Sequence, residues 1–253
     1  MTIPPPAPVH VSRGAVLRQD GVALWRQIAS IIEADIAAGR CPPGARLPTE
    51  AAFAASFGVN RHTVRRALEE LSHAGLVRVE QGRGAFVAED VLDYTVGPRT
   101  RFSEWIQKQN KEPSGQVLAL AELAAPANIA RGLGIRTGAR VVHYRRLGLA
   151  DGRPVSLTDH YFSAQRLPGM LAALRTESSI TAALRRVGID DYLRESSKVT
   201  ARAPGTGEAS LLRTARNRPL LICENINVDR AGAVVEFAIS RYPTPRVQII
   251  FEP

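Results

Sequence analysis

The sequence contains little cysteine and no long apolar run. Its two cysteines, Cys41 and Cys223, lie far apart without a CxxC or Cys/His ligand spacing, so neither a disulfide framework nor a zinc site is predicted. No apolar stretch approaches membrane-spanning length, and the first residues lack the features of a secretory signal. We therefore expect a cytoplasmic protein with a flexible tail over residues 1–19 and with no metal or cofactor.

The length and charge of the chain favour two domains and a polyanionic partner. The 253 residues exceed the usual size of one domain, and 45% apolar with 23% charged residues is an ordinary globular composition. The net charge is +9, but residues 1–90 hold ten Arg and nine Asp or Glu, a net charge of only +1. The excess charge therefore does not locate the surface that binds a polyanion.

Residues 20–88 carry the signals of a winged helix-turn-helix. Apolar residues recur at helical spacing from Leu24, and the segment CPPGARLP ends that helix. Thr49 can cap a short helix through Phe57, and Asn60 can cap a third helix from about Arg61 to Ala74. The runs LVRVE and AFVA around QGRG then predict a hairpin with Arg83 at its tip.

The third helix has one apolar and one basic face. A helical wheel places Val64, Leu68 and Leu71 on one side and His62, Arg65 and Arg66 on the other. A short helix, a glycine turn and a longer basic helix form the geometry that enters the major groove, where Arg61 and Arg65 could reach guanine edges or phosphates. The alternative is that these arginines only solvate a helix face.

The segment LPTEAAFAASFGVNRHTVRRALEELSHAGLVRVEQGRGAFV resembles the DNA-binding domain of the GntR superfamily of bacterial regulators. Many members have an arginine after the glutamate of helix two, where this chain has Ala51, so a contact made there by relatives is not expected. With His62 added from the exposed helix face, the DNA-binding residues that the resemblance implies are Thr49, Glu50, Asn60, Arg61, His62, Thr63, Arg65, Gly82, Arg83 and Gly84.

The remaining residues predict an α+β domain. The Asp151-Gly152 turn joins two strands over 139–150 and 154–162, and further strands are expected over 219–228, 234–242 and 247–251. Helical spacing over 179–187 and 206–212 favours an antiparallel sheet with helices packed on one side. A helix that begins after about Thr100 leaves free amide groups near Phe102 and Ser103, which suit an anion.

Several segments of this domain, among them RTRFSEWI, RRLGLADGRPVSLTDHYF and SSITAALRRVGI, resemble the HutC subfamily, whose UTRA effector domain resembles chorismate lyase. Within it, ADGRPVS, SITAAL and DYLR are most similar to the PhnF-type regulators of phosphonate utilisation. The effector-binding residues implied by this resemblance are Arg101, Phe102, Ser103, Arg146, Thr158, His160, Ser179, Thr181, Arg241 and Tyr242. Gly148 and Thr158 replace an arginine and an acid of many relatives, which favours an anion smaller than a sugar phosphate.

The sequence therefore predicts a repressor with a DNA-binding domain over 20–88, a linker over 89–98 and an effector domain over 99–253. We expect a homodimer on palindromic double-stranded operator DNA, controlled by a phosphonate, phosphate or phosphate ester. A carboxylate or sugar phosphate is the alternative effector. A lyase-like enzyme that uses Asp159 and His160 is the alternative of another class, although neighbouring strand residues point to opposite faces. A third possibility is an architectural protein that binds nucleic acid and has no small-molecule ligand.

Overall fold

A computed structural model describes residues 11, 21–88, 91–99, 101–177 and 179–251, so the expected tail over 1–19 lies outside the described residues except for Val11. Contacts within the chain divide it into two compact units, one up to residue 90 and one from Val91 onwards. The segment expected to be a linker contains strand β3 (Leu92–Val96), which pairs in parallel with β10 (Val247–Phe251) of the second unit. Residues 92–96 therefore form a strand of the second unit.

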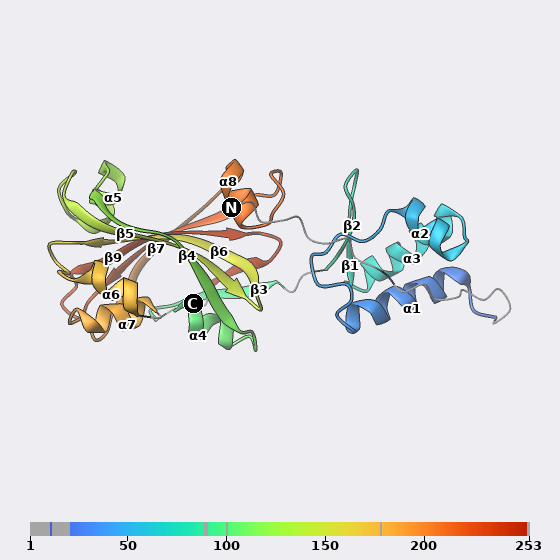
Figure 1. The fold of residues 1–253 in the computed structure, drawn as a ribbon, viewed down its shortest axis with the longest axis horizontal. Helices are drawn as coiled ribbons and strands as arrows, with labels where there is room; N and C mark the ends of the chain where they lie inside the picture. The colour runs from blue at the N-terminus through green and yellow to red at the C-terminus, as the bar shows by residue number, and fades with distance from the viewer. Residues whose placement is uncertain (1–10, 12–20, 89–90, 100, 178, 252–253) are drawn as a thin grey trace. The chain divides into compact units, whose positions relative to one another are not determined.

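The first unit is three helices and a hairpin: α1 (Leu24–Ala37), α2 (Glu50–Phe57), α3 (Arg61–His73), β1 (Val77–Glu80) and β2 (Gly84–Val87) (Figure 1). The predicted caps are confirmed: the Thr49 side chain accepts a hydrogen bond from the Ala52 amide, and Asn60 accepts one from the Thr63 amide. Ile28, Ile32 and Phe53 from α1 and α2 pack with the buried side of α3 in one core.

The hairpin gains a third backbone segment that the sequence did not predict. Arg46 forms an isolated antiparallel bridge to Phe86, and the Leu47 amide donates to the Ala85 carbonyl at 2.9 Å. The segment that ends α1 therefore also braces β2. At the hairpin tip, Gly82 and Gly84 have φ values of 72° and 106°, a conformation that other residues rarely adopt.

The second unit is built on a six-stranded, fully antiparallel sheet in the order β4-β5-β6-β9-β8-β7. Asp151 and Gly152 both have positive φ, which confirms the predicted tight turn between β5 and β6. The strands are β4 (Pro113–Ala124), β5 (Arg140–Ala150), β6 (Arg153–Ser163), β7 (Leu193–Arg202), β8 (Leu220–Val228) and β9 (Val234–Pro243).

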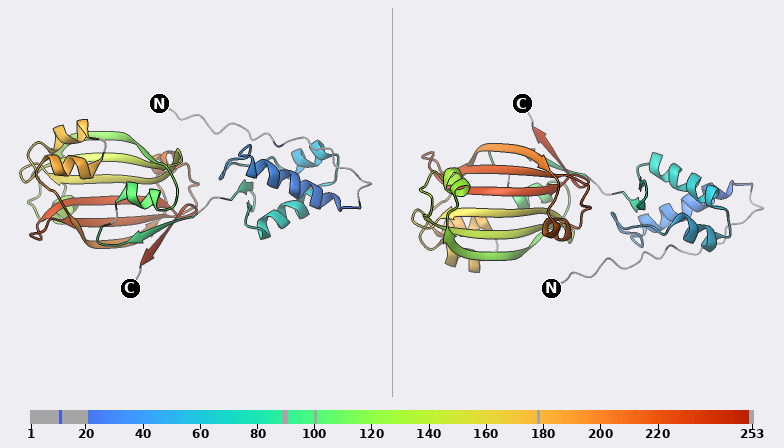
Figure 2. Two further views of the ribbon diagram at one scale, coloured as in Figure 1. Left: turned by 90° about the horizontal axis from the view of Figure 1, so that it is seen from below. Right: turned by 90° about the horizontal axis from the view of Figure 1, so that it is seen from above.

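Helices cover both faces of this sheet, which corrects our expectation of helices on one side. One face carries α4 (Phe102–Gln107), α6 (Met170–Thr176) and α7 (Ile180–Arg186), and the other carries α5 (Ala127–Leu133) and α8 (Thr206–Leu211) (Figure 2). Because α5 and α8 pack at the two ends of their face, each buries a separate apolar cluster. None of the helices in the described part of the chain is long and apolar enough to cross a bilayer.

The Asn60 cap gives a test of the first unit. Asn60→Ala removes the 2.8 Å hydrogen bond to the Thr63 amide, so we expect the free energy of unfolding of this unit to fall by about 1 kcal/mol. Urea unfolding followed by circular dichroism measures the change. Glu69→Ala, an exposed change in the same helix, should stay within about 0.5 kcal/mol. Equal unfolding midpoints for Asn60→Ala and the unchanged protein would contradict the capping role.

Candidate functional sites

The outer face of α3 is a basic surface. Arg61, His62, Arg65 and Arg66 are exposed, while Val64 and its apolar neighbours are buried, as the helical wheel predicts. Thr63 is tied to the helix start, because its hydroxyl also donates to Asn60 Oδ1 at 2.9 Å. The residues expected to bind DNA on this helix therefore lie together on the accessible face of the helix.

Arg65 is held in place by Glu50 at the start of α2. Its Nε and Nη2 donate to the two Glu50 carboxylate oxygens at 3.1 and 2.9 Å, a two-pronged pair. The hydrogen bond from Arg65 lowers the pKa of Glu50, which therefore stays ionised. The pair is partly exposed, so it fixes the direction of the guanidinium more than it stabilises the fold.

Other arginines near this surface are also oriented by neighbours. The Arg66 guanidinium lies 4.7 Å from the Trp25 ring centroid, a cation–π contact that links α3 to α1. Arg83 at the hairpin tip forms a 2.6 Å ion pair with Glu80. Two predicted DNA-binding elements, the helix face and the hairpin tip, thus carry oriented cations.

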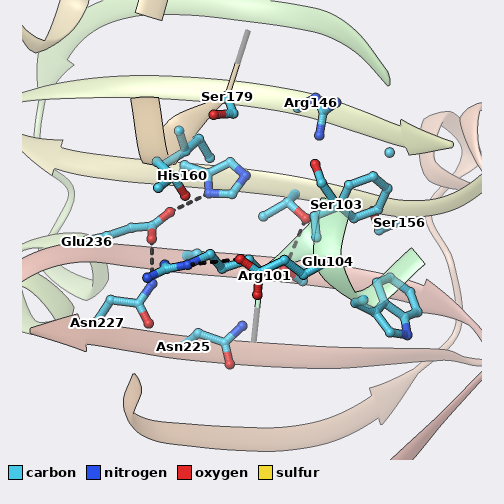
Figure 3. A pocket seen from close by; sticks show the side chains of 18 of the residues that line it. Arg101, Ser103, Glu104, Arg146, Ser156, His160, Ser179, Asn225, Asn227 and Glu236 are labelled. Carbon is cyan, nitrogen blue, oxygen red and sulfur yellow. Dashed lines mark hydrogen bonds and ion pairs between the residues drawn. The ribbon is translucent and has the colours of Figure 1, made fainter. Parts of the chain in front are cut away.

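The second unit holds a cavity of about 330 Å³ between the sheet and helices α4 and α7 (Figure 3). Alternate residues over part of β5, β6, β8 and β9 face it, since strand side chains alternate between the two faces of a sheet. The side chains that line it include Tyr144, Arg146, Ser156, Thr158, His160, Asn225, Asn227, Glu236, Ser240 and Tyr242, with Arg101 to Trp105 on the α4 side.

Arg146 is a cation without an acidic partner in the described part of the chain. Its guanidinium lies 5.2 Å from the Phe102 ring centroid and close against Gly115, where a Cβ atom would come within 2.6 Å of it. Burial lowers the pKa of Arg146, because desolvation disfavours the charged form. A partly buried guanidinium that lacks a carboxylate is a strong candidate to bind an anion.

Arg101 supplies a second cation to the cavity. It stacks on the Tyr192 ring at 4.2 Å, while its Nη2 lies 3.4 Å from Asp191. Its Nη1 is buried and has no hydrogen-bond partner among the described residues. A buried donor left without an acceptor favours a ligand oxygen at this position.

The inner wall of the cavity is a hydrogen-bonded network in which the predicted His160 joins residues that the sequence did not single out. Glu236 accepts hydrogen bonds from His160 Nδ1 and from Asn227 Nδ2, each at 2.5 Å. Arg194 donates to the side-chain oxygens of Asn227 and Asn225 at 2.7 and 2.8 Å. Burial raises the pKa of Glu236, but the contributions of His160, Asn227 and Arg194 together outweigh it and hold this pKa below its usual value.

Of the expected effector residues, all except Arg241 line this cavity. Arg241 follows Ser240 on β9 and therefore points to the other face, where it pairs with Asp159 at 2.6 Å and Glu208 at 2.7 Å. There the hydrogen bonds from Arg202 lower the pKa of Glu208 to about 2. Our assignment of Arg241 to the pocket was thus wrong, because Arg241 lies one residue after Ser240, which does face the cavity.

Two other charged residues lie outside the cavity. Arg99, which precedes α4, pairs with Asp191 at 2.5 Å and is not among the residues that line the cavity. Asp159 faces away from His160 and binds His143 at 2.7 Å, so the two neighbours form no catalytic dyad, as strand geometry predicts. Within the described ranges, no group of three His, Cys, Asp or Glu side chains is arranged to hold a metal.

Two family models match the two units in turn. Residues 24–87 match the bacterial regulatory proteins of the gntR family, and residues 108–248 match the UTRA domain. A winged helix-turn-helix followed by this domain defines a transcriptional regulator. The chain belongs to the gntR family, in its HutC-type branch with a UTRA domain.

The relatives and a solved structure agree with this assignment. The chain is 38% identical to an uncharacterised HTH-type transcriptional regulator from Rhizobium meliloti, over 94% of this chain and 98% of the relative. It is 30% identical to the probable transcriptional regulator PhnF of Escherichia coli, over 90% and 94%. The crystal structure of PhnF from Mycobacterium smegmatis aligns with a TM-score of 0.62 at 28% identity, covering 88% of this chain and 97% of that one.

Gly148 offers a test of how the cavity wall is packed. A Cβ atom there would lie 2.3 Å from Ser156 Oγ and 2.6 Å from the Phe102 ring, so Gly148→Ala must displace both side chains. We expect Gly148→Ala to lower the free energy of unfolding of the second unit by about 1–3 kcal/mol, measured by chemical denaturation. Gly207→Ala, which meets open space, is the matched control and should be neutral or stabilising. Equal stability of the two variants would refute the packing argument.

Proposed function

We propose that this protein is a repressor that binds palindromic operator DNA as a homodimer and responds to a small anion in the cavity of its UTRA domain. The observation that carries the ligand part is Arg146, a partly buried guanidinium with no acidic partner in the described residues. The proposal of operator binding rests on the exposed basic face of α3 and on a hairpin tip whose two glycines have positive φ. Repression and dimerisation follow the habit of the family.

On the DNA side, we assign Arg61 and Arg65 to the major groove and Arg83 to the neighbouring backbone or groove. Glu50 acts by orienting Arg65, and Asn60 acts by capping the helix, whose free amides lie near the groove. The remaining members of the proposed contact set are Thr49, His62, Thr63, Gly82 and Gly84.

On the ligand side, the cavity favours a compact anion such as phosphate, a phosphonate or a phosphate ester. The space at residue 148 is filled by the Phe102 ring and Ser156, which limits the size of a ligand beside Arg146. Two relatives of this chain are named PhnF. The resemblance of the effector domain to PhnF-type regulators of phosphonate utilisation motivates this ligand class. We assign Phe102, Ser103, Thr158, Ser179, Thr181 and Tyr242 to the wall around Arg101, Arg146 and His160.

A structural change on ligand binding can be transmitted to β3 through contacts of α4. Trp105 lines the cavity, and its indole Nε1 donates to the Asp93 carbonyl of β3 at 2.8 Å. The Asp93 amide in turn donates to Gln109 at 2.8 Å. A ligand that holds α4 in one position therefore biases β3, the first strand after the boundary between the units. It changes operator affinity only if it binds two arrangements of the dimer unequally.

Arg65→Ala tests the DNA-binding surface. If the Arg65 guanidinium reads a base, its loss should weaken binding by about 1–3 kcal/mol and relax specificity at one position. Fluorescence anisotropy with DNA selected from a random pool by the unchanged protein measures this. Arg131→Ala, which removes an exposed charge in the second unit, should bind as tightly as the unchanged protein. Undiminished affinity of Arg65→Ala for the selected DNA would remove Arg65 from the interface.

Arg146→Ala tests the anion site. Phosphate, phosphonates, phosphate esters and carboxylates are first screened for thermal stabilisation, which a ligand of the folded state must cause. Arg146→Ala should lose the response of operator binding to any hit while its operator affinity stays unchanged. Arg140→Ala, an exposed arginine on the same strand, should respond normally. A normal response from Arg146→Ala would show that the effector binds elsewhere.

A further inference from the structure

The inner wall of the cavity carries a histidine that is hydrogen-bonded to a buried glutamate. The two lie on neighbouring strands, His160 on β6 and Glu236 on β9, and the Glu236 side chain is only 4% exposed. Because its second oxygen accepts from Asn227, both oxygens of the carboxylate are directed at protein donors. Nδ1 of His160 is thereby fixed as a donor toward Glu236.

The other ring nitrogen of His160, Nε2, faces the cavity. It points away from Glu236 into the space that a ligand would occupy (Figure 3). No side chain in the described part of the chain is hydrogen-bonded to it. A ligand oxygen in the cavity would therefore be the natural second partner of this imidazole.

With Nδ1 donating to Glu236, a neutral imidazole presents only a lone pair at Nε2. A fully ionised anion offers only acceptors, so it can be hydrogen-bonded to Nε2 only if that nitrogen gains a proton. Besides His160, the ionisable groups that line the cavity are Tyr94 on β3, Tyr144 and Arg146 on β5, Arg194 on β7, Glu236 and Tyr242 on β9, Arg101 and Glu104 at α4, Arg185 on α7, and Tyr192.

We propose that the effector anion is bound together with a proton, which His160 takes up from solvent. The resulting imidazolium donates one hydrogen bond from Nδ1 to Glu236 and the other from Nε2 to the anion. Glu236 is then a positioning residue that acts on the ligand through His160. This inference rests on the proposed anion site and adds its regulation: since a proton is consumed on binding, anion affinity is high at low pH and is lost as pH rises.

Calorimetric titration with sulfate tests the coupling in the full-length protein. Sulfate keeps the same charge throughout the neutral range, so any proton exchanged belongs to the protein. Titrations in two buffers of different ionisation enthalpy should show proton uptake when sulfate binds, and the uptake should vanish at a pH low enough for His160 to be protonated before sulfate binds. Over the pH range in which uptake is seen, affinity should fall with rising pH by up to about tenfold per pH unit, the limit for one linked proton.

Three variants separate this role from a merely structural one. His160→Gln should bind sulfate more weakly, with no proton uptake and no dependence on pH. Glu236→Gln retains an acceptor for Nδ1 but lacks the charge, so the loss of affinity should begin at a lower pH. His143→Gln is the matched control, because His143 forms a similar 2.7 Å pair with Asp159 on the opposite face of the sheet, and it should retain proton uptake.

The outcomes distinguish this inference from the proposed function. Sulfate binding that takes up no proton, yet is abolished by Arg146→Ala, would overturn the coupling and leave the anion site intact. Loss of proton uptake in His143→Gln, with uptake retained in His160→Gln, would also overturn it. If the unchanged protein binds no sulfate at about pH 6, the anion site and the coupling both fail.

Discussion

The cavity of the second unit depends on a guanidinium that has been partly removed from water without a carboxylate beside it. Arg146 lies against Gly115 and the Phe102 ring, neither of which carries a negative charge. A desolvated cation is costly unless a negative group compensates it. An anionic ligand provides that compensation. Part of the free energy spent on desolvating Arg146 is therefore recovered when an anion binds beside it.

Because side chains alternate along the strands, the two faces of the sheet carry different sets of charged residues. On the opposite face, Arg241 meets Asp159 and Glu208, and His143 also binds Asp159, so cations and carboxylates are paired. On the cavity face, Arg146 meets aromatic and polar groups that carry no negative charge. The same sheet thus holds cations paired with carboxylates on one side and, on the other, a cavity in which Arg146 has no carboxylate partner among the described residues.

Features that depend on neighbouring residues were predictable in both units, whereas strands that depend on long-range pairing in the second unit were not. The caps at Thr49 and Asn60 and the positive-φ turn at Asp151-Gly152 need only neighbouring residues, and the structure has each of them. Strands β4 and β7 were missed because their alanine-rich and charged sequences favour no strand, and neighbours distant in the chain determine them. Glu236 was not predicted as a site residue, because only the register of β9 against β6 brings it to the cavity.

The most direct test of the anion site is a crystal structure of the protein soaked in selenate, which has the shape and charge of sulfate and scatters anomalously. The account predicts an anomalous peak within the cavity, in hydrogen-bond reach of Arg146 and of Arg101 or His160. A cavity without such a peak, in crystals where selenate binds at other surfaces, would contradict it.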